Sequence, residues 1–241
     1  MGLDCTGITS PDCTGGRTIS PLAVPVPLLP SQIAAAHRIY ALTTQWQHTQ
    51  RAFELLRERV PGFDLAACLL KVAAVNQLYG TNVYAVGRMA EHVAGIMAAP
   101  PDDLIDLVEM IACLPPAEGQ KQTHRHWSFA SKFAHFFVDD RIPIYDWYVW
   151  EMVRFHLGAG FIPGDPAKPY RSLAENLARL RSLFGITCSA GELDCYLWLA
   201  GVYREWQRKG PIAQINAEAK AMFENPTPEV KRALLEMAPP G

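Results

Sequence analysis

The residue types best suited to chemistry are concentrated in one segment, residues 121–151, KQTHRHWSFASKFAHFFVDDRIPIYDWYVWE. If residues 127–137 are helical, their phenylalanines form an apolar stripe, and Lys132 lies beside Phe129 and Phe136 at spacings of three and four residues. An amine in that position is partly desolvated, and desolvation favours the neutral, nucleophilic form of an amine. Lys132 is therefore a candidate nucleophile.

Asp146 is the second candidate catalytic residue. Pro143 favours an extended chain just before it, and the apolar residues that follow Asp146 predict a helix that it caps. The backbone fixes the orientation of a capping carboxylate, so such a group can stabilise positive charge that develops on a substrate. Each residue also has a structural interpretation, because lysines often extend from apolar helices to solvent and aspartates often only cap. Together the two residues predict a lysine and carboxylate pair.

Helices alone are expected to position this pair. Apolar residues recur every three or four positions, and no run alternates as a half-buried strand would. We predict an all-α, compact multi-helix fold, with residues 31–241 as one unit that is possibly bilobed, after a loose proline-rich arm at residues 1–30. The predicted helices are one long helix from residue 31 to Pro61, then 65–78, 83–97, 101–113, 125–137, 144–157, 169–184, 190–209 and 228–237.

The order of these elements resembles a known family. A helix bearing SFASK, an extended IPIYD and an aromatic helix are similar to the helix-hairpin-helix DNA glycosylases, particularly divergent 8-oxoguanine glycosylase-like members. By this resemblance Lys132 would attack the sugar C1′ as a Schiff-base nucleophile, Asp146 would assist, and a flipped base would leave. The sequence Trp127-Ser-Phe-Ala-Ser131 stands where that family has a glycine-containing hairpin.

Two further stretches extend the similarity over roughly residues 65–201. Residues 69–86, LLKVAAVNQLYGTNVYAV, resemble the family's earlier helix-loop-helix, whose polar loop enters the gap that the flipped base leaves. The second stretch is the later helix ELDCYLWLAG. The four-cysteine loop of the iron-sulfur branch is missing, so no cluster and no other cofactor is expected.

Base excision needs aromatic surfaces for the flipped base and polar or cationic contacts to the strand. The candidate base-pocket residues are Trp127, Phe129, Tyr145, Trp147, Tyr148 and Trp198. The candidate DNA-binding residues are Gln77, Tyr79, Thr81, Asn82, Lys121, His124, Arg125, His126, Ser128 and Ser131. The histidines are not spaced as the ligands of a metal site would be, and no metal site is predicted.

Composition limits the other possibilities. The 241 residues are 49% hydrophobic and 19% charged, with a formal net charge of -2, and no apolar stretch is long enough to span a bilayer. The first twenty residues do not read as an export signal, and three of the six cysteines lie in helix-like apolar patterns. We therefore expect a cytoplasmic monomer, nucleoid-associated when bound to DNA.

Three functions from different classes remain. The first is a DNA glycosylase, with AP-lyase activity, that acts on a damaged or modified base in DNA repair or in antiviral defence against modified viral DNA. The second is a non-catalytic helical module that binds nucleic acid or protein, which full burial of Lys132 in a salt bridge would favour. The third is a Schiff-base lysine enzyme that acts on a small molecule, which a narrow pocket without a basic rim would favour.

Overall fold

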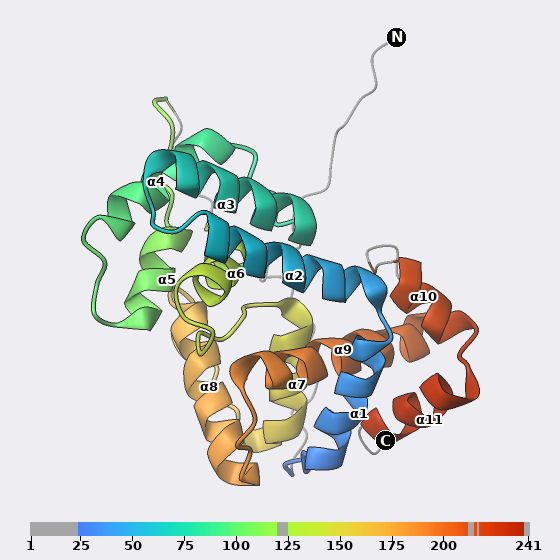
Figure 1. The fold of residues 1–241 in the computed structure, drawn as a ribbon. Helices are drawn as coiled ribbons and strands as arrows, with labels where there is room; N and C mark the ends of the chain where they lie inside the picture. The colour runs from blue at the N-terminus through green and yellow to red at the C-terminus, as the bar shows by residue number, and fades with distance from the viewer. Residues whose placement is uncertain (1–23, 120–124, 212–214, 216, 239–241) are drawn as a thin grey trace.

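The computed structural model describes residues 24–119, 125–211, 215 and 217–238. In these residues the chain forms α-helices joined by loops and one 3-10 turn, with no β-strand, so the predicted all-α class is confirmed (Figure 1). The helices are α1 (Pro30–Ala41), α2 (Thr44–Arg59), α3 (Leu65–Tyr79), α4 (Val86–Met97), α5 (Leu104–Ala112), α6 (Trp127–Phe137), α7 (Trp147–Leu157), α8 (Pro169–Phe184), α9 (Ala190–Lys209), α10 (Ala217–Glu224) and α11 (Pro228–Met237).

The helices enclose two hydrophobic cores. The first core is built mainly from α2 to α6, and the second from α1 and α7 to α11 (Figure 1). We call these groups the first and second lobes. Tyr145, in the segment between α6 and α7, packs against both cores, and Tyr170 of α8 lies in the first. The catalytic candidates therefore lie where the chain crosses from one lobe to the other.

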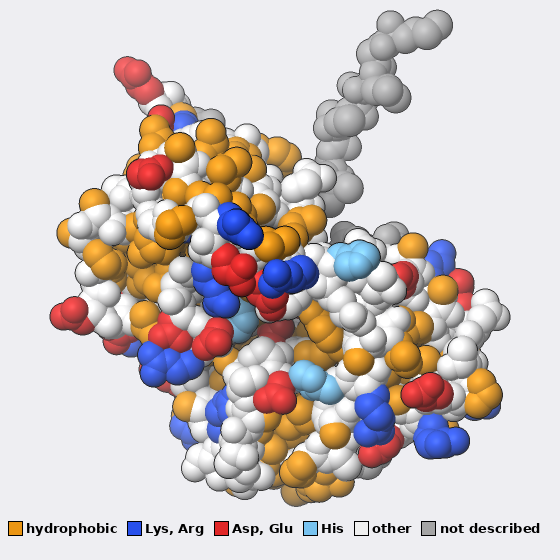
Figure 2. Space-filling view, in the orientation of Figure 1, with side chains coloured by type: hydrophobic (Ala, Val, Ile, Leu, Met, Phe, Trp, Pro, Cys, Tyr) orange, Lys and Arg blue, Asp and Glu red, His pale blue; other side chains and the backbone are white. Residues whose placement is uncertain are grey.

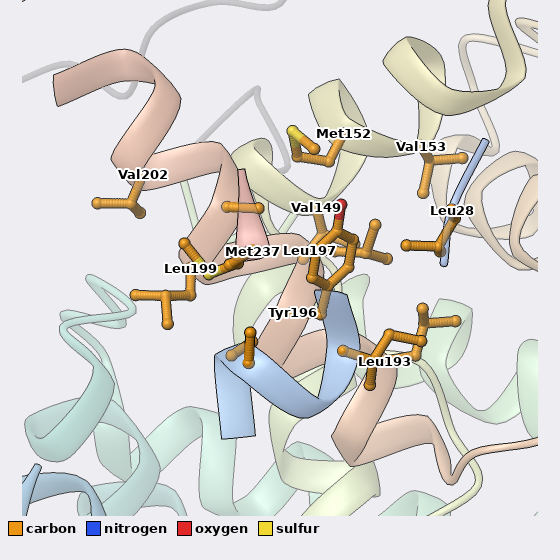
Figure 3. Packing of buried hydrophobic residues seen from close by; sticks show 14 of the residues in the cluster. Leu28, Val149, Met152, Val153, Leu193, Tyr196, Leu197, Leu199, Val202 and Met237 are labelled. Carbon is orange, nitrogen blue, oxygen red and sulfur yellow. The ribbon is translucent and has the colours of Figure 1, made fainter. Parts of the chain in front are cut away.

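The end of the proline-rich arm is part of the second lobe. Leu28 is 2% exposed, and Figure 3 shows it among residues of α7 and α9. The Val26 amide donates to the His156 carbonyl at 2.9 Å, while the His156 ring bonds the Val26 carbonyl and the Tyr196 hydroxyl. The expectation of a loose arm is wrong at its end, because Leu28 packs in the second core and the Val26 backbone bonds His156. Residues 1–23 lie outside the described residues.

The predicted long helix that starts at residue 31 is two helices. Thr43 adopts an extended backbone between α1 and α2, and its hydroxyl bonds the Ile39 carbonyl. Ile39 packs in the second core, whereas Phe53 of α2 packs in the first. The apolar spacing continues across the break because each helix has an apolar face, but the two faces serve different cores.

Other differences are local. α7 begins at Trp147, because residues 142–146 are not helical and Asp146 has an extended backbone. α4 begins at Val86, after a loop in which Asn82 has a φ of 57°. α10 was not predicted. α5 packs against α6, but their connection includes residues 120–124, which lie outside the described residues, so the hairpin stays a prediction. Among the described helices, none is both long and apolar enough to cross a bilayer.

Candidate active site

Lys132 lies in the middle of α6 and is almost fully buried, with 5% of its surface exposed. Its Nζ donates a hydrogen bond to the Ser128 hydroxyl at 2.8 Å and lies 3.9 Å from Oδ2 of Asp146. The same nitrogen is 5.5 Å from the centre of the Tyr79 ring, which contributes a cation–π contact from α3. The amine is thus enclosed by one carboxylate, one hydroxyl and one aromatic ring.

Asp146 is the N-cap of α7, as the sequence predicts. Its Oδ1 accepts a hydrogen bond from the Tyr148 amide at 2.9 Å, which leaves Oδ2 directed at Lys132. One oxygen therefore fixes the carboxylate to the helix terminus, and the other faces the amine. A carboxylate held in this way needs little reorganisation when positive charge develops beside it.

Two polar side chains of α6 hold the extended segment that leads to Asp146. The Ser131 hydroxyl accepts the Tyr145 amide at 2.9 Å, and the His135 ring bonds the Ile142 carbonyl at 2.8 Å. Both residues are buried, and burial lowers the pKa of His135, so the neutral ring donates to that carbonyl. Lys132 directly follows Ser131 and lies about one helical turn before His135 in α6. The two anchors therefore hold the chain that leads to Asp146 beside Lys132.

Asp194 of α9 is a third ionisable group near the pair, and the sequence analysis did not select it. It is half-buried, but its Oδ1 is inaccessible and has no hydrogen-bond partner among the described residues. Burial raises the pKa of its carboxyl to about 7, and the negative charge of Asp146 adds to this shift while Lys132 opposes it. At neutral pH a large fraction of Asp194 is therefore a neutral acid.

Asp194 also lines a cavity of about 330 Å³ between the segment before α7 and the helices α8 and α9. Pro143 and Ile144 form one wall, Leu193 and Leu197 another, and Arg181 lies at the C-terminal end of α8. The cavity is mostly apolar with few polar groups, as ligand pockets usually are. Figure 2 shows a recess between the two lobes on the face drawn there.

Three aromatic side chains, from α1, α2 and α9, pack against one another. Trp198 of α9 packs edge-on against Trp46, whose ring stacks on Tyr40 at 5.5 Å. The Tyr79 ring stacks on Phe53 and Phe136 on the first-lobe side, 5.5 Å from the Lys132 amine. Tyr40 and Trp46 were not among the predicted residues.

A signal for Asp194 was present in the sequence. Glu192 closes a capping box with Ser189, which explains one acid at the start of α9, but no capping role explains Asp194. It is also the only charged residue between positions 193 and 203. An acid within an apolar helix is costly unless it has a partner or a function.

The predicted site residues divide into separate groups. Ser128, Tyr79, Lys132 and Asp146 come together. Phe129 and Ser131 are fully buried, so they lie in the interior and not at a surface that DNA could reach in this conformation. Trp198 and Tyr148 pack against the second core and Tyr145 against both cores, whereas Trp147 is 57% exposed.

Trp127, a predicted base-pocket residue, and the remaining predicted DNA contacts lie at two other places. Arg125, His126 and Trp127 are at the start of α6, where the Arg125 guanidinium packs over the Trp127 ring. Gln77, Thr81 and Asn82 are at the end of α3, where the Asn76 side chain bonds Thr81 and the Val83 backbone. Lys121 and His124 lie outside the described residues. Within the described part of the chain, no group of three or more His, Cys, Asp or Glu side chains could hold a metal ion.

Comparison with known proteins gives one partial match. Residues 33–141 match the model of the family HI_0787_N, which is described as an N-terminal domain. This stretch includes Lys132 but ends before Asp146 and Asp194. No curated protein and no solved structure matches the chain.

Proposed function

We propose that this protein is a DNA glycosylase in which Lys132 is the nucleophile and Asp146 stabilises the positive charge that develops on the sugar. The observation that carries the proposal is the Lys132–Asp146 pair, 3.9 Å apart, at the junction of the two lobes. An amine beside a fixed carboxylate suits a reaction whose transition state resembles an oxocarbenium ion. After the base leaves, the amine is bonded to C1′ as a Schiff base, and loss of a C2′ proton then nicks the strand.

The neighbouring cavity supports the same function. At about 330 Å³ it has the size of a small-molecule pocket, and a nucleobase is a flat ligand of that class. Enzymes that act on a base within a duplex turn it out of the stack into such a pocket. Tyr79 of the first lobe covers the Lys132 amine with its aromatic ring.

A purely structural ion pair is the main alternative, and the burial of Lys132 favours it. The geometry argues for a reactive amine, because structural buried pairs need close, hydrogen-bonded contact to offset desolvation. At 3.9 Å the amine and the carboxylate are in the range of an ion pair but beyond a hydrogen bond. The Lys132 amine therefore donates no hydrogen bond to Asp146, which a tight ion pair would include.

Borohydride trapping tests the proposal. The purified protein is incubated with duplexes and single strands that carry oxidised purines, alkylated bases or hypermodified viral bases, and with DNA that contains an abasic site. Reduction of the Schiff base would leave a covalent protein–DNA adduct in the wild type. We expect Lys132→Gln to abolish the adduct. We expect Asp146→Asn to slow base release by about 10²- to 10⁴-fold, the usual contribution of one catalytic group.

A matched control is available in α3. Lys71 is a second buried lysine, 2% exposed, which lies over the Phe63 ring and donates to the Gly62 carbonyl. Lys71→Met should leave the adduct unchanged, because the Lys71 amine bonds Gly62 and lies over Phe63, whereas the Lys132 amine lies beside Asp146. No adduct and no base release from any of these DNAs would reject the glycosylase proposal.

A small-molecule enzyme is the second candidate function, and the surface charge favours it. Figure 2 shows acidic and basic side chains interspersed over α2, where Arg51 pairs with Glu54 and Glu58. Strong binding to DNA usually uses a basic surface. A Lys132-dependent borohydride adduct with free modified nucleosides or short aldehydes, but not with DNA, would support this alternative.

A further inference from the structure

We infer that Asp194 is the general acid of this site and donates a proton to the departing base. The inference rests on the proposed glycosylase function and adds a second catalytic carboxyl group with a role distinct from that of Asp146. It also defines a substrate class: bases that are neutral in DNA and depart easily only after a ring nitrogen or carbonyl oxygen receives a proton.

The positions of the two carboxyl groups support this division of roles. Asp146 faces the Lys132 amine at 3.9 Å and is capped by backbone, so its negative charge is compensated. Asp194 contributes to the cavity wall, while its buried Oδ1 receives no hydrogen bond from the described residues. A buried carboxyl oxygen without a donor is costly as a carboxylate and is tolerated as a protonated acid.

The surroundings of Asp194 also favour a proton donor. The titratable groups near Asp194 or in the lining of the same cavity come from several elements. They are Tyr79 of α3, Lys132 of α6, Arg141 before α7, Asp146 of α7, Arg181 of α8, Cys188 before α9 and Cys195 of α9. Arg141 bonds Asp139, and Arg181 bonds the carbonyls of residues 186, 188 and 189, so both cations have other partners. Burial brings the pKa of Asp194 to about 7, and a catalytic acid works best with a pKa near the working pH. Two carboxyl groups whose environments separate their protonation states are a frequent arrangement for acid catalysis.

The proposed step balances. The bond between C1′ and the base nitrogen breaks, its electron pair stays on the base, and the base takes the proton of Asp194. Lys132 first gives up a proton to water; its nitrogen lone pair then forms the new bond to C1′, and the nitrogen becomes positively charged. The proton that this nitrogen then loses returns to the Asp194 carboxylate, so the acid is regenerated and the base leaves as a neutral molecule.

The test separates base release from the later chemistry of the sugar. In single-turnover assays, duplexes with 8-oxoguanine or hypoxanthine, which need protonation, are compared with 7-methylguanine, a base that is already cationic. We expect Asp194→Asn to slow release of the neutral bases by about 10²- to 10⁴-fold and 7-methylguanine release by less than about three-fold. Wild-type release of neutral bases should fall as the pH rises above about 7, and the variant should lack this decline. Asp194→Glu should restore part of the rate.

Abasic DNA provides the control for folding and for Lys132. It has no base to protonate, so Asp194→Asn should form the borohydride adduct at a rate within about two-fold of the wild type. Equal loss of trapping and base release would overturn the inference, because Asp194 would then act through Lys132. Unchanged release of neutral bases would overturn it too, as would a wild type that traps abasic DNA but releases no base. A wild type that does neither would instead reject the glycosylase proposal.

Discussion

Replacement of Asp194 by asparagine should stabilise the protein at neutral pH. The structure places the Asp194 carboxyl where its pKa is raised from 3.8 to about 7, mainly by burial. The folded state therefore binds a proton that the unfolded chain has already released between these two pH values. Stability must fall as the pH rises through this window, because the unfolded state carries fewer protons there than the folded state.

The size of the effect follows from the pKa difference. The shift of the pKa from 3.8 to about 7 lowers the free energy of unfolding of the wild type by at most about 4 kcal/mol above pH 7. Relaxation of the cavity and entry of water reduce this penalty in real proteins, so we expect Asp194→Asn to gain about 2 to 4 kcal/mol at about pH 7.5. At about pH 4 the wild-type acid is protonated, and the two proteins should then be nearly equal.

Urea unfolding at these two pH values measures the effect, and Asp102→Asn serves as the control because Asp102 is exposed. The control should differ from the wild type by less than about 0.5 kcal/mol at both pH values. Equal or lower stability of Asp194→Asn at about pH 7.5 would refute the reasoning. It would mean that Asp194 is a stabilising, paired carboxylate, which could not act as a proton donor at neutral pH.

Two other predictions test parts of the fold that support the site. Burial lowers the pKa of His156 to about 4, so its contribution is present above pH 6.5 and is lost as the pH falls toward 4. Between about pH 6.5 and 4 the free energy of unfolding of the wild type should fall by about 3 kcal/mol more than that of His156→Gln, measured in urea titrations. The same dependence on pH in both proteins would contradict this prediction. In α9, a Cβ on Gly201 would lie 2.9 Å from the Tyr148 carbonyl oxygen, so Gly201→Ala should lower thermal stability by about 1 to 3 kcal/mol. Gly191→Ala is the matched control: its Cβ would meet nothing closer than 3.8 Å, and it should be neutral or stabilising by up to about 1 kcal/mol.

Short-range signals made much of the fold predictable from the sequence. Asp64, Asp103, Asp146, Ser189 and Thr227 cap the helices that follow them, and each bonds an amide of the first turn. Such caps depend on a few consecutive residues, so spacing alone locates them. The break at Thr43 could not be located in this way, since it depends on two cores that α1 and α2 face separately.

The Lys132–Asp146 pair was predictable for a similar reason. Both residues lie in one continuous segment, where a helix and the next N-cap are evident from the pattern. What fixes the distance between them is less evident, because Ser131 and His135 hold the intervening chain through its backbone. A serine and a histidine in a helix are usually interpreted as surface groups, and Ser131 was predicted to contact DNA. Both are buried because the extended segment beside them has amide and carbonyl groups that need partners.

Asp194 required the tertiary structure. Its local sequence predicts a buried helix and marks the acid only as an anomaly, whereas its protonation depends on groups from α6 and α7 that the fold brings close. Lys132 lowers the pKa of Asp194 and Asp146 raises it, so the net shift depends on where the fold places the two groups. The same arrangement explains why an acid is placed where it destabilises the fold at neutral pH. A carboxyl group that keeps its proton there must be buried without a strong partner, and such burial is what costs stability. Its stability effect and its proposed role in base release therefore have one physical origin.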